Sequence, residues 1–317
     1  MTPDWLATML RDPSAPLATA DPADRLAATL DGFSLEVHAR DAGEVAELED
    51  MLAPGTDVHI ASLTGQPLAP VLDACRLLKS AGMNPVPHVV ARGFVSRAAL
   101  ESFLDSAAAQ AGVEKVLLVG GDADRPAGPF ASALDVLATG LLVKYDLREV
   151  GIAAYPDGHR LLSNATLIHA LVDKLALGAA QGLTMQVFTQ FSFEARSAVD
   201  WLARHRHEFG ATPVAVGMAG PMRLANLLRY ASRCGVAGTL RALTTHRDTT
   251  SRLFSEAAPD RQLAALAALR RTPPPGPLPT VHFFTFGALR HTLAWVEAVR
   301  ERRVRFTADG GFDVLPR

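Results

Sequence analysis

Cysteine is scarce in this sequence. The chain has two cysteines in 317 residues, Cys75 and Cys234, and they lie far apart. Two isolated thiols fit no metal-ligand spacing and are typical of a reducing compartment, so we expect a cytoplasmic protein. The first residues include acidic side chains and form no long apolar core, which argues against a signal peptide.

Neither charge nor hydrophobicity is concentrated in one segment. The chain has 31 basic and 33 acidic residues, a net charge of −2, and no strongly basic stretch. It has no uninterrupted apolar run of about 18 residues, the length that a membrane-spanning helix needs. We therefore expect neither nucleic acid nor membrane as partner.

Several catalytic motifs are also missing. No G-x-G-x-x-G follows the first expected strand, no H-E-x-x-H or H-x-H spacing occurs, and G-x-S-x-G is absent. These absences argue against a dinucleotide fingerprint, a metal site and a serine nucleophile. We expect no metal cofactor.

Short apolar runs alternate strictly with helical patterns along the chain. Strict alternation predicts a parallel sheet, and eight units predict a closed α/β barrel of the (β/α)8, or TIM, type. One helix is expected over 131–143. The eight expected strands are residues 33–38, 57–61, 85–90, 116–119, 149–154, 184–193, 213–218 and 281–286.

We predict a single domain with short extensions. Residues 1–31 form a leader with a short helix over 21–30, residues 32–305 form the barrel, and residues 306–317 form a tail that is either an extra strand or loose. The segment 236–280 is less regular than the rest. A homo-oligomer is compatible with the sequence, which does not decide the oligomeric state.

The stretch Val116–Asp122 (VLLVGGD) shows best how the expected strands end. An apolar run stops at Gly120 and Gly121, and Asp122 follows at the carboxyl end of the strand. Ligands of parallel α/β folds bind at these ends. By itself, the pattern is also compatible with a simple turn in which Asp122 caps the next element.

Other expected strands also place polar residues at their carboxyl ends. One such residue is often only a hydrogen-bonded core group, but several at the same end of a barrel predict a functional site. The candidates are Glu36, Ser62, His88, Asp122, Tyr155, His159 and Gln190.

Glu36 is the sharpest candidate. It lies between Leu35 and Val37 in an expected buried strand, where an unpaired carboxylate is costly. Burial is expected to raise its pKa, as a general acid near neutral pH requires, while Asp122 stays ionised. The alternative is a salt bridge to a barrel arginine.

Several segments resemble the methylenetetrahydrofolate reductase family of flavin-containing (β/α)8 enzymes. The likeness covers roughly residues 33–300. It is carried in order by FSLEV (33–37), PHVVAR (87–92), VGGD (119–122), AAYPDGH (153–159), KLALGAA (174–180), TQFSFE (189–194), VGMAGP (216–221) and HFFTF (282–286).

The resemblance implies a reaction and a set of roles. NADH or NADPH would reduce bound FAD, and the flavin would reduce 5,10-methylenetetrahydrofolate to 5-methyltetrahydrofolate, or run the reverse reaction. Glu36 would be the general acid that opens the folate's imidazolidine ring, and Asp122 would tune pterin and flavin. Substrate contacts are implied for Gln190, with Gln186 as its competitor, and for Phe286. Flavin contacts are implied for Ser62, His88, Gly121, Asp122, Tyr155, His159 and Lys174.

The sequence also departs from the family's pattern. Gly120 stands where the family usually has arginine, and the helix over 166–174 lacks several of its polar positions. These departures leave open a reductase-like protein without flavin, which transfers hydride directly or acts as a non-catalytic folate-binding or partner subunit. An unrelated lyase or aldolase needs a Schiff-base lysine at a strand end, and the sequence predicts none.

Overall fold

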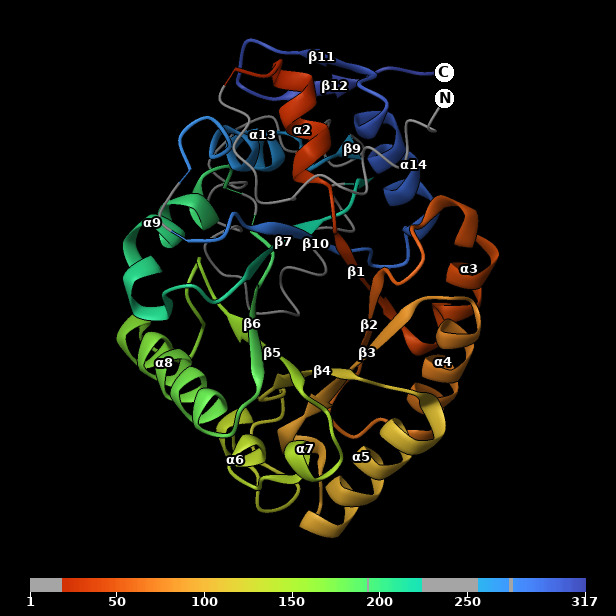
Figure 1. Cartoon of the computed structure of the whole chain (residues 1–317), viewed down its shortest axis with the longest axis vertical. Coiled ribbons are helices and arrows are strands. Elements are labelled where there is room, and N and C mark those ends of the chain that lie inside the picture. Colours follow the sequence, from red (N-terminus) through yellow and green to blue (C-terminus); the bar gives the residue numbers. More distant parts are fainter. Residues whose placement is uncertain (1–18, 193, 224–255, 274–275) are drawn as a thin grey trace.

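The computed structural model describes residues 19–192, 194–223, 256–273 and 276–317. Eight parallel strands close into a barrel in the order β1-β10-β7-β6-β5-β4-β3-β2 (Figure 1). The prediction of a (β/α)8 barrel is confirmed. The strands are β1 (Ser34–His38), β2 (Asp57–Ala61), β3 (Asn84–Val90), β4 (Lys115–Val119), β5 (Glu149–Ala154), β6 (Thr184–Thr189), β7 (Val214–Ala219) and β10 (Thr280–Phe284).

Helices cover the outside of the barrel (Figure 1). The segment expected as one helix over 131–143 is instead two short helices, because Gly140 adopts a left-handed conformation with φ of 69° between them. The described helices are α2 (Pro22–Thr29), α3 (Ala42–Glu47), α4 (Ala69–Ser80), α5 (Arg97–Ala111), α6 (Ala133–Leu137), α7 (Leu141–Lys144), α8 (Asn164–Ala180), α9 (Ser197–Phe209), α13 (Asp260–Ala268) and α14 (Leu289–Arg300).

The period of two along each strand separates the helix-facing core from the barrel interior. On β1, Leu35 and Val37 pack under the helices, so Glu36 between them points into the barrel. One large apolar cluster joins the strands to the surrounding helices. A single contiguous core of this kind is typical of one domain.

Interior side chains stack in layers contributed by alternate strands, as in other such barrels. Following the strand register, the middle layer consists of His59, Leu117, Phe188 and His282. All four are buried. The next layer toward the carboxyl ends consists of Glu36, His88, Ala153 and Gly217.

The two ends of the interior differ. At the amino end, Lys115 Nζ lies 2.6 Å from Asp57 Oδ2 and 2.9 Å from Glu149 Oε2. Burial alone lowers the pKa of Lys115, but these two carboxylates raise it above its ordinary value. At the carboxyl end, which we call the mouth, Glu36 and Ala153 are partly exposed to solvent. The carboxyl end is also the end at which barrels of this type bind their ligands.

The helix α2 and the tail both pack beside α13 and α14 (Figure 1). In α2, Leu26 and Leu30 at its C-cap are buried, and the Arg270 guanidinium donates to the Ala28 carbonyl at 2.7 Å. The tail forms an antiparallel pair with the residues before it, β11 (Val304–Phe306) with β12 (Phe312–Val314). Another short pair joins β8 (Met222–Arg223) to β9 (Glu256–Ala257). Among the described helices, none has the length and apolar character to cross a membrane.

Candidate active site at the mouth of the barrel

The candidate site is centred on the Glu36 carboxylate, which lies between two imidazoles. Glu36 Oε2 is 3.4 Å from His88 Nε2 and 3.8 Å from His282 Nε2. The Glu36 side chain retains 15% exposure, whereas His282 retains 1%. We call Glu36, His88 and His282 the Glu36 cluster. No arginine pairs with Glu36 within the described residues, so the structure does not support the alternative of a salt bridge to a barrel arginine.

Both imidazoles turn an unsatisfied nitrogen toward this carboxylate. The Nε2 atoms of His88 and His282 are buried and have no hydrogen-bond partner. The other ring nitrogen of His282, Nδ1, lies 2.8 Å from Ser34 Oγ. When Ser34 donates this hydrogen bond, the proton of a neutral His282 sits on Nε2 and points to Glu36.

The pKa of Glu36 corrects the expectation from the sequence. Burial raises this pKa, but the positive potential of His88 and the close approach of His282 lower it below its ordinary value. The sequence indicated burial but not the imidazoles on neighbouring strands. The Glu36 carboxyl is therefore ionised near neutral pH in the protein without ligand. To act as an acid, it must first receive a proton from another group.

His59 closes the interior below this cluster. Its ring lies 4.6 Å from Phe188 and 4.5 Å from His282, centroid to centroid. Neither of its ring nitrogens has a hydrogen-bond partner, and burial followed by the charges of His282 and His88 holds its pKa well below the ordinary value. His59 thus acts as a neutral aromatic spacer.

Aromatic residues line one side of the mouth. Phe284 and Phe286 stack with ring centroids 5.8 Å apart, and Phe191 lies edge-on to both at 5.2 Å. Phe286 has φ of 48°, a left-handed conformation that is costly for a bulky side chain. Strained residues of this kind concentrate at binding sites. Gln190 lies directly after β6, next to Phe191.

A second group lies at the start of the loop after β5. Tyr155 and His159 meet edge-to-face, with ring centroids 5.3 Å apart. Burial, and then the charges of Arg160 and Arg92, lower the pKa of His159. The loop therefore combines an aromatic ring with positive potential, which suits a flat ligand that bears an anionic group.

Asp122 is not brought into the Glu36 cluster. It is exposed in the loop after β4 and makes no hydrogen bond or ion pair with the described residues. Arg92 holds this loop in place, because its Nε donates to the Ala131 carbonyl at 2.8 Å and its Nη1 to the Ala123 carbonyl at 2.9 Å. Gly121 allows a close approach, since a Cβ there would lie 2.7 Å from Val90 Cγ1.

Three other expected residues lie apart from this cluster. Ser62 is buried at the end of β2. Gln186 lies two layers below Phe188, at the level of Lys115, so the filled middle layer separates it from the mouth. Lys174 lies on α8, outside the barrel wall, and burial lowers its pKa to about 8.

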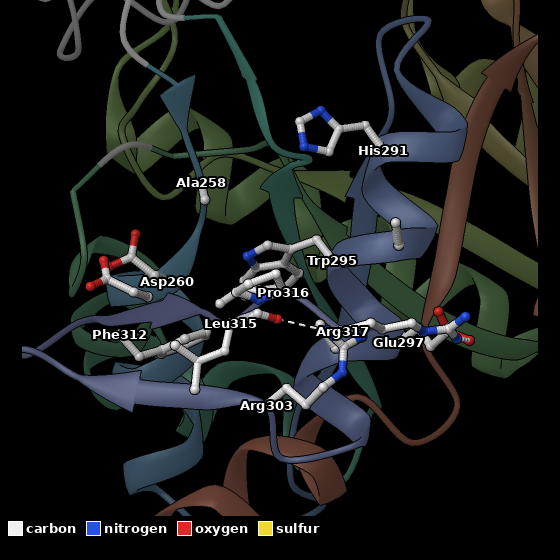
Figure 2. A pocket seen from close by; sticks show the side chains of 14 residues that line it. Ala258, Asp260, His291, Trp295, Glu297, Arg303, Phe312, Leu315, Pro316 and Arg317 are labelled. Atoms are coloured by element: carbon white, nitrogen blue, oxygen red, sulfur yellow. Dashed lines mark hydrogen bonds and ion pairs between the residues drawn. The ribbon is translucent and has the colours of Figure 1, made fainter.

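A separate pocket lies away from the mouth. Its volume is about 780 Å³, and it lies between α13, α14 and the β11–β12 pair (Figure 2). Trp295 and Pro316 line it, while Arg317 pairs with Glu297 at 2.7 Å. Among the residues that the structure describes, no group of three histidine, cysteine or acidic side chains is arranged to hold a metal.

The sequence analysis missed the two buried residues that complete the site, His282 and its partner Ser34. A signal existed, since each lies at an interior position two residues from another mouth residue, Phe284 and Glu36 respectively. Only barrel closure, which pairs Ser34 with His282, shows that both belong to one cluster.

No protein-family model matches the chain. Among solved structures, an uncharacterized protein from Clostridium thermocellum that binds two copies of 5-methyl-5,6,7,8-tetrahydrofolic acid is similar over 85% of this chain and 94% of its own, with a TM-score of 0.55 and 11% identity. A GH18 chitinase from Pseudoalteromonas aurantia is similar over 85% of this chain and 99% of its own, with a TM-score of 0.50 and 10% identity. At such identities the likeness shows the shared barrel fold alone.

Proposed function

We propose that this protein is a reductase of the methylenetetrahydrofolate reductase type. It transfers a hydride from NADH or NADPH to 5,10-methylenetetrahydrofolate, or catalyses the reverse reaction. The observation that carries the proposal is a carboxylate, Glu36, at the base of a solvent-accessible barrel mouth, between two imidazoles and below an aromatic rim. The family resemblance of the segments around these residues supports the same reaction.

The reaction needs one proton and one hydride. Glu36 gives a proton to the folate nitrogen that leaves when the imidazolidine ring opens, and the resulting iminium carbon accepts the hydride. The carboxylate that remains stabilises the positive charge of the iminium. The nicotinamide is oxidised, and the one-carbon unit is reduced from methylene to methyl.

The mouth suits a pterin. Phe284 and Phe286 offer aromatic faces to a flat heteroring, and the Gln190 side chain offers both a donor and an acceptor to its edge. Gln190 is preferred to Gln186 for this role because Gln186 lies below the filled middle layer. The Clostridium thermocellum protein of similar fold binds two copies of 5-methyl-5,6,7,8-tetrahydrofolic acid, which supports a folate ligand here.

Replacing the proton donor tests the proposal. Glu36→Gln is expected to lower the rate of methylenetetrahydrofolate reduction by about 10²–10⁴-fold, because the amide cannot give up a proton. Binding of 5-methyltetrahydrofolate, measured by titration calorimetry, should change little. His59→Phe serves as the control, since it removes an interior imidazole that makes no hydrogen bond. Full turnover by Glu36→Gln would refute this role.

The residues expected for FAD fit the cofactor only in part. Tyr155 and His159 lie together near the mouth and suit an aromatic ring and a phosphate. Lys174, however, lies on α8 outside the barrel wall, and His88 turns its Nε2 toward Glu36. When bound, FAD would relay the hydride between nicotinamide and folate. The incomplete set favours a second candidate, direct hydride transfer without flavin.

An absorbance spectrum separates the two routes. Direct transfer predicts a colourless purified protein that oxidises NAD(P)H only when methylenetetrahydrofolate is present. The flavin route predicts a visible flavin band, after purification or after addition of FAD, that NAD(P)H bleaches and methylenetetrahydrofolate restores. A protein that shows neither behaviour but binds tetrahydrofolate would support the non-catalytic alternative.

A further inference from the structure

The Glu36 cluster raises a question about the proton. Glu36 is ionised near neutral pH, yet the proposed reaction needs it to donate. A proton source must therefore lie within reach of Glu36 Oε2. The buried candidates are the imidazoles of His88, at 3.4 Å, and His282, at 3.8 Å.

The surroundings distinguish the two imidazoles. His88 is in the same interior layer as Glu36, and its side chain is buried but retains 9% exposure. His282 is one layer lower, almost fully buried, and its Nδ1 is engaged with Ser34 at 2.8 Å. A group that exchanges protons with solvent must be close to the mouth, whereas a deeply buried group whose Nδ1 is held by a hydrogen bond suits a fixed, positioning role.

We infer that His88 passes protons to Glu36, and that His282, held by Ser34, is a positioning residue that keeps the carboxylate turned toward His88 and the mouth. This inference rests on the proposed function, since the proton is the one that Glu36 gives to the folate. In the forward direction the proton leaves His88 Nε2 for Glu36 Oε2 and then moves to the departing folate nitrogen. Water at the mouth reprotonates His88. These steps transfer a proton only, and no group is oxidised or reduced in them.

The charged and titratable groups around the pair are few. His59 stays neutral because burial and its neighbours hold its pKa well below the ordinary value. Strands β5, β6 and β7 contribute only Ala153, Phe188 and Gly217 at these levels. The other titratable groups nearby are His38 on β1, which acts on Glu36 and His88, and His59 on β2, which in turn feels Lys115 on β4.

The inference fixes the sign of the pH dependence. Burial lowers the pKa of His88, and Glu36 partly restores it. The imidazole is therefore protonated only below its ordinary range, and kcat/KM for folate reduction should fall as pH rises through this titration. In His88→Gln the fall should shift to lower pH, where Glu36 itself titrates, so that the rate at about pH 7 drops by one to two orders of magnitude.

The decisive experiment measures the protonation of the histidine side chains directly in the full-length protein. Histidine side-chain ¹⁵N chemical shifts are followed against pH in the wild type, Glu36→Gln and His59→Phe. Removing the anion beside His88 should lower the pKa of His88 by about one unit in Glu36→Gln. His59→Phe should leave it near the wild-type value. A His88 titration that ignores Glu36→Gln would overturn the inference, even in an active reductase.

Kinetics separate the positioning role from the proton source. Ser34→Ala and His282→Gln should lower kcat several-fold and leave KM nearly unchanged. In both variants kcat/KM should still fall with rising pH over the wild-type range, the pH limb that His88→Gln loses. Loss of that limb in Ser34→Ala would overturn the assignment to His88. If the protein reduces no folate while Glu36→Gln still shifts His88, the proposed function fails and the coupling of the pair stands.

Discussion

Lys174 shows how much one side chain depends on its surroundings. Lys174 is half-buried on α8, and no hydrogen bond or ion pair to a described residue compensates its ammonium. Burial therefore lowers its pKa from 10.5 to about 8. A charge kept in such a place lowers the stability of the fold unless a ligand supplies an anion.

Lys174→Met is expected to stabilise the protein. The unfolded chain binds this proton up to about pH 10.4, whereas the folded chain releases it near 8, so stability rises with pH between the two values. At pH 7 the full penalty is present, and its removal should raise the free energy of unfolding by on the order of 2 kcal/mol.

Urea unfolding at pH 7 and at pH 9.5 measures this effect. The gain should shrink at the higher pH. Lys79→Met is a suitable control, because Lys79 is exposed and pairs with Glu114 at 2.8 Å. If FAD or a phosphate-bearing nucleotide stabilises the wild type more than Lys174→Met, the lysine binds that ligand. Equal stability of both proteins at pH 7 would contradict the assigned burial penalty.

Single strands show packing that the sequence pattern conceals. Gly151 on β5 reads as an ordinary small residue inside an apolar run. In the barrel, a Cβ at this position would lie 2.8 Å from Leu117 Cδ1 and 2.9 Å from Phe188 Cε2. Because Gly151 has no side chain, Phe188 can fill the middle layer beneath Glu36.

Gly151→Ala should therefore destabilise the fold by about 1–3 kcal/mol through overpacking. Gly43→Ala on α3 is the matched control, because a Cβ there has no atom within 4 Å and alanine favours a helix. Denaturant unfolding of both variants checks the prediction. A Gly151→Ala protein as stable as the Gly43→Ala protein would show that the interior is less tightly filled than described.

Element boundaries also differ from the sequence pattern. The sixth strand was expected over 184–193, but β6 ends at Thr189. There the Thr189 hydroxyl accepts from the Gly217 N–H at 2.9 Å, and Gln190 begins the loop. Apolar character continues beyond the strand because Phe191 packs against Phe284 at the mouth, so periodicity alone overestimated the length.

Closure of the whole barrel creates the site. Ser34 and His282 are 248 residues apart, and the pairing of β1 with β10 places their side chains 2.8 Å from each other. The Thr285 hydroxyl donates to the Glu36 carbonyl at 2.7 Å and fastens the same seam near the mouth. The Glu36 cluster therefore exists only when the first and last strands meet.

The sequence by itself determined the architecture and the place of the central carboxylate. Strict strand–helix alternation implies a parallel barrel, and a period of two places Glu36 inside it. Both are local patterns that any short window of the chain displays. Tertiary structure alone decided the rest, namely the imidazole partners and lowered pKa of Glu36, the exposure of Asp122 and the burial of Lys174 outside the barrel wall. These properties depend on register and desolvation between distant segments, which no local pattern records.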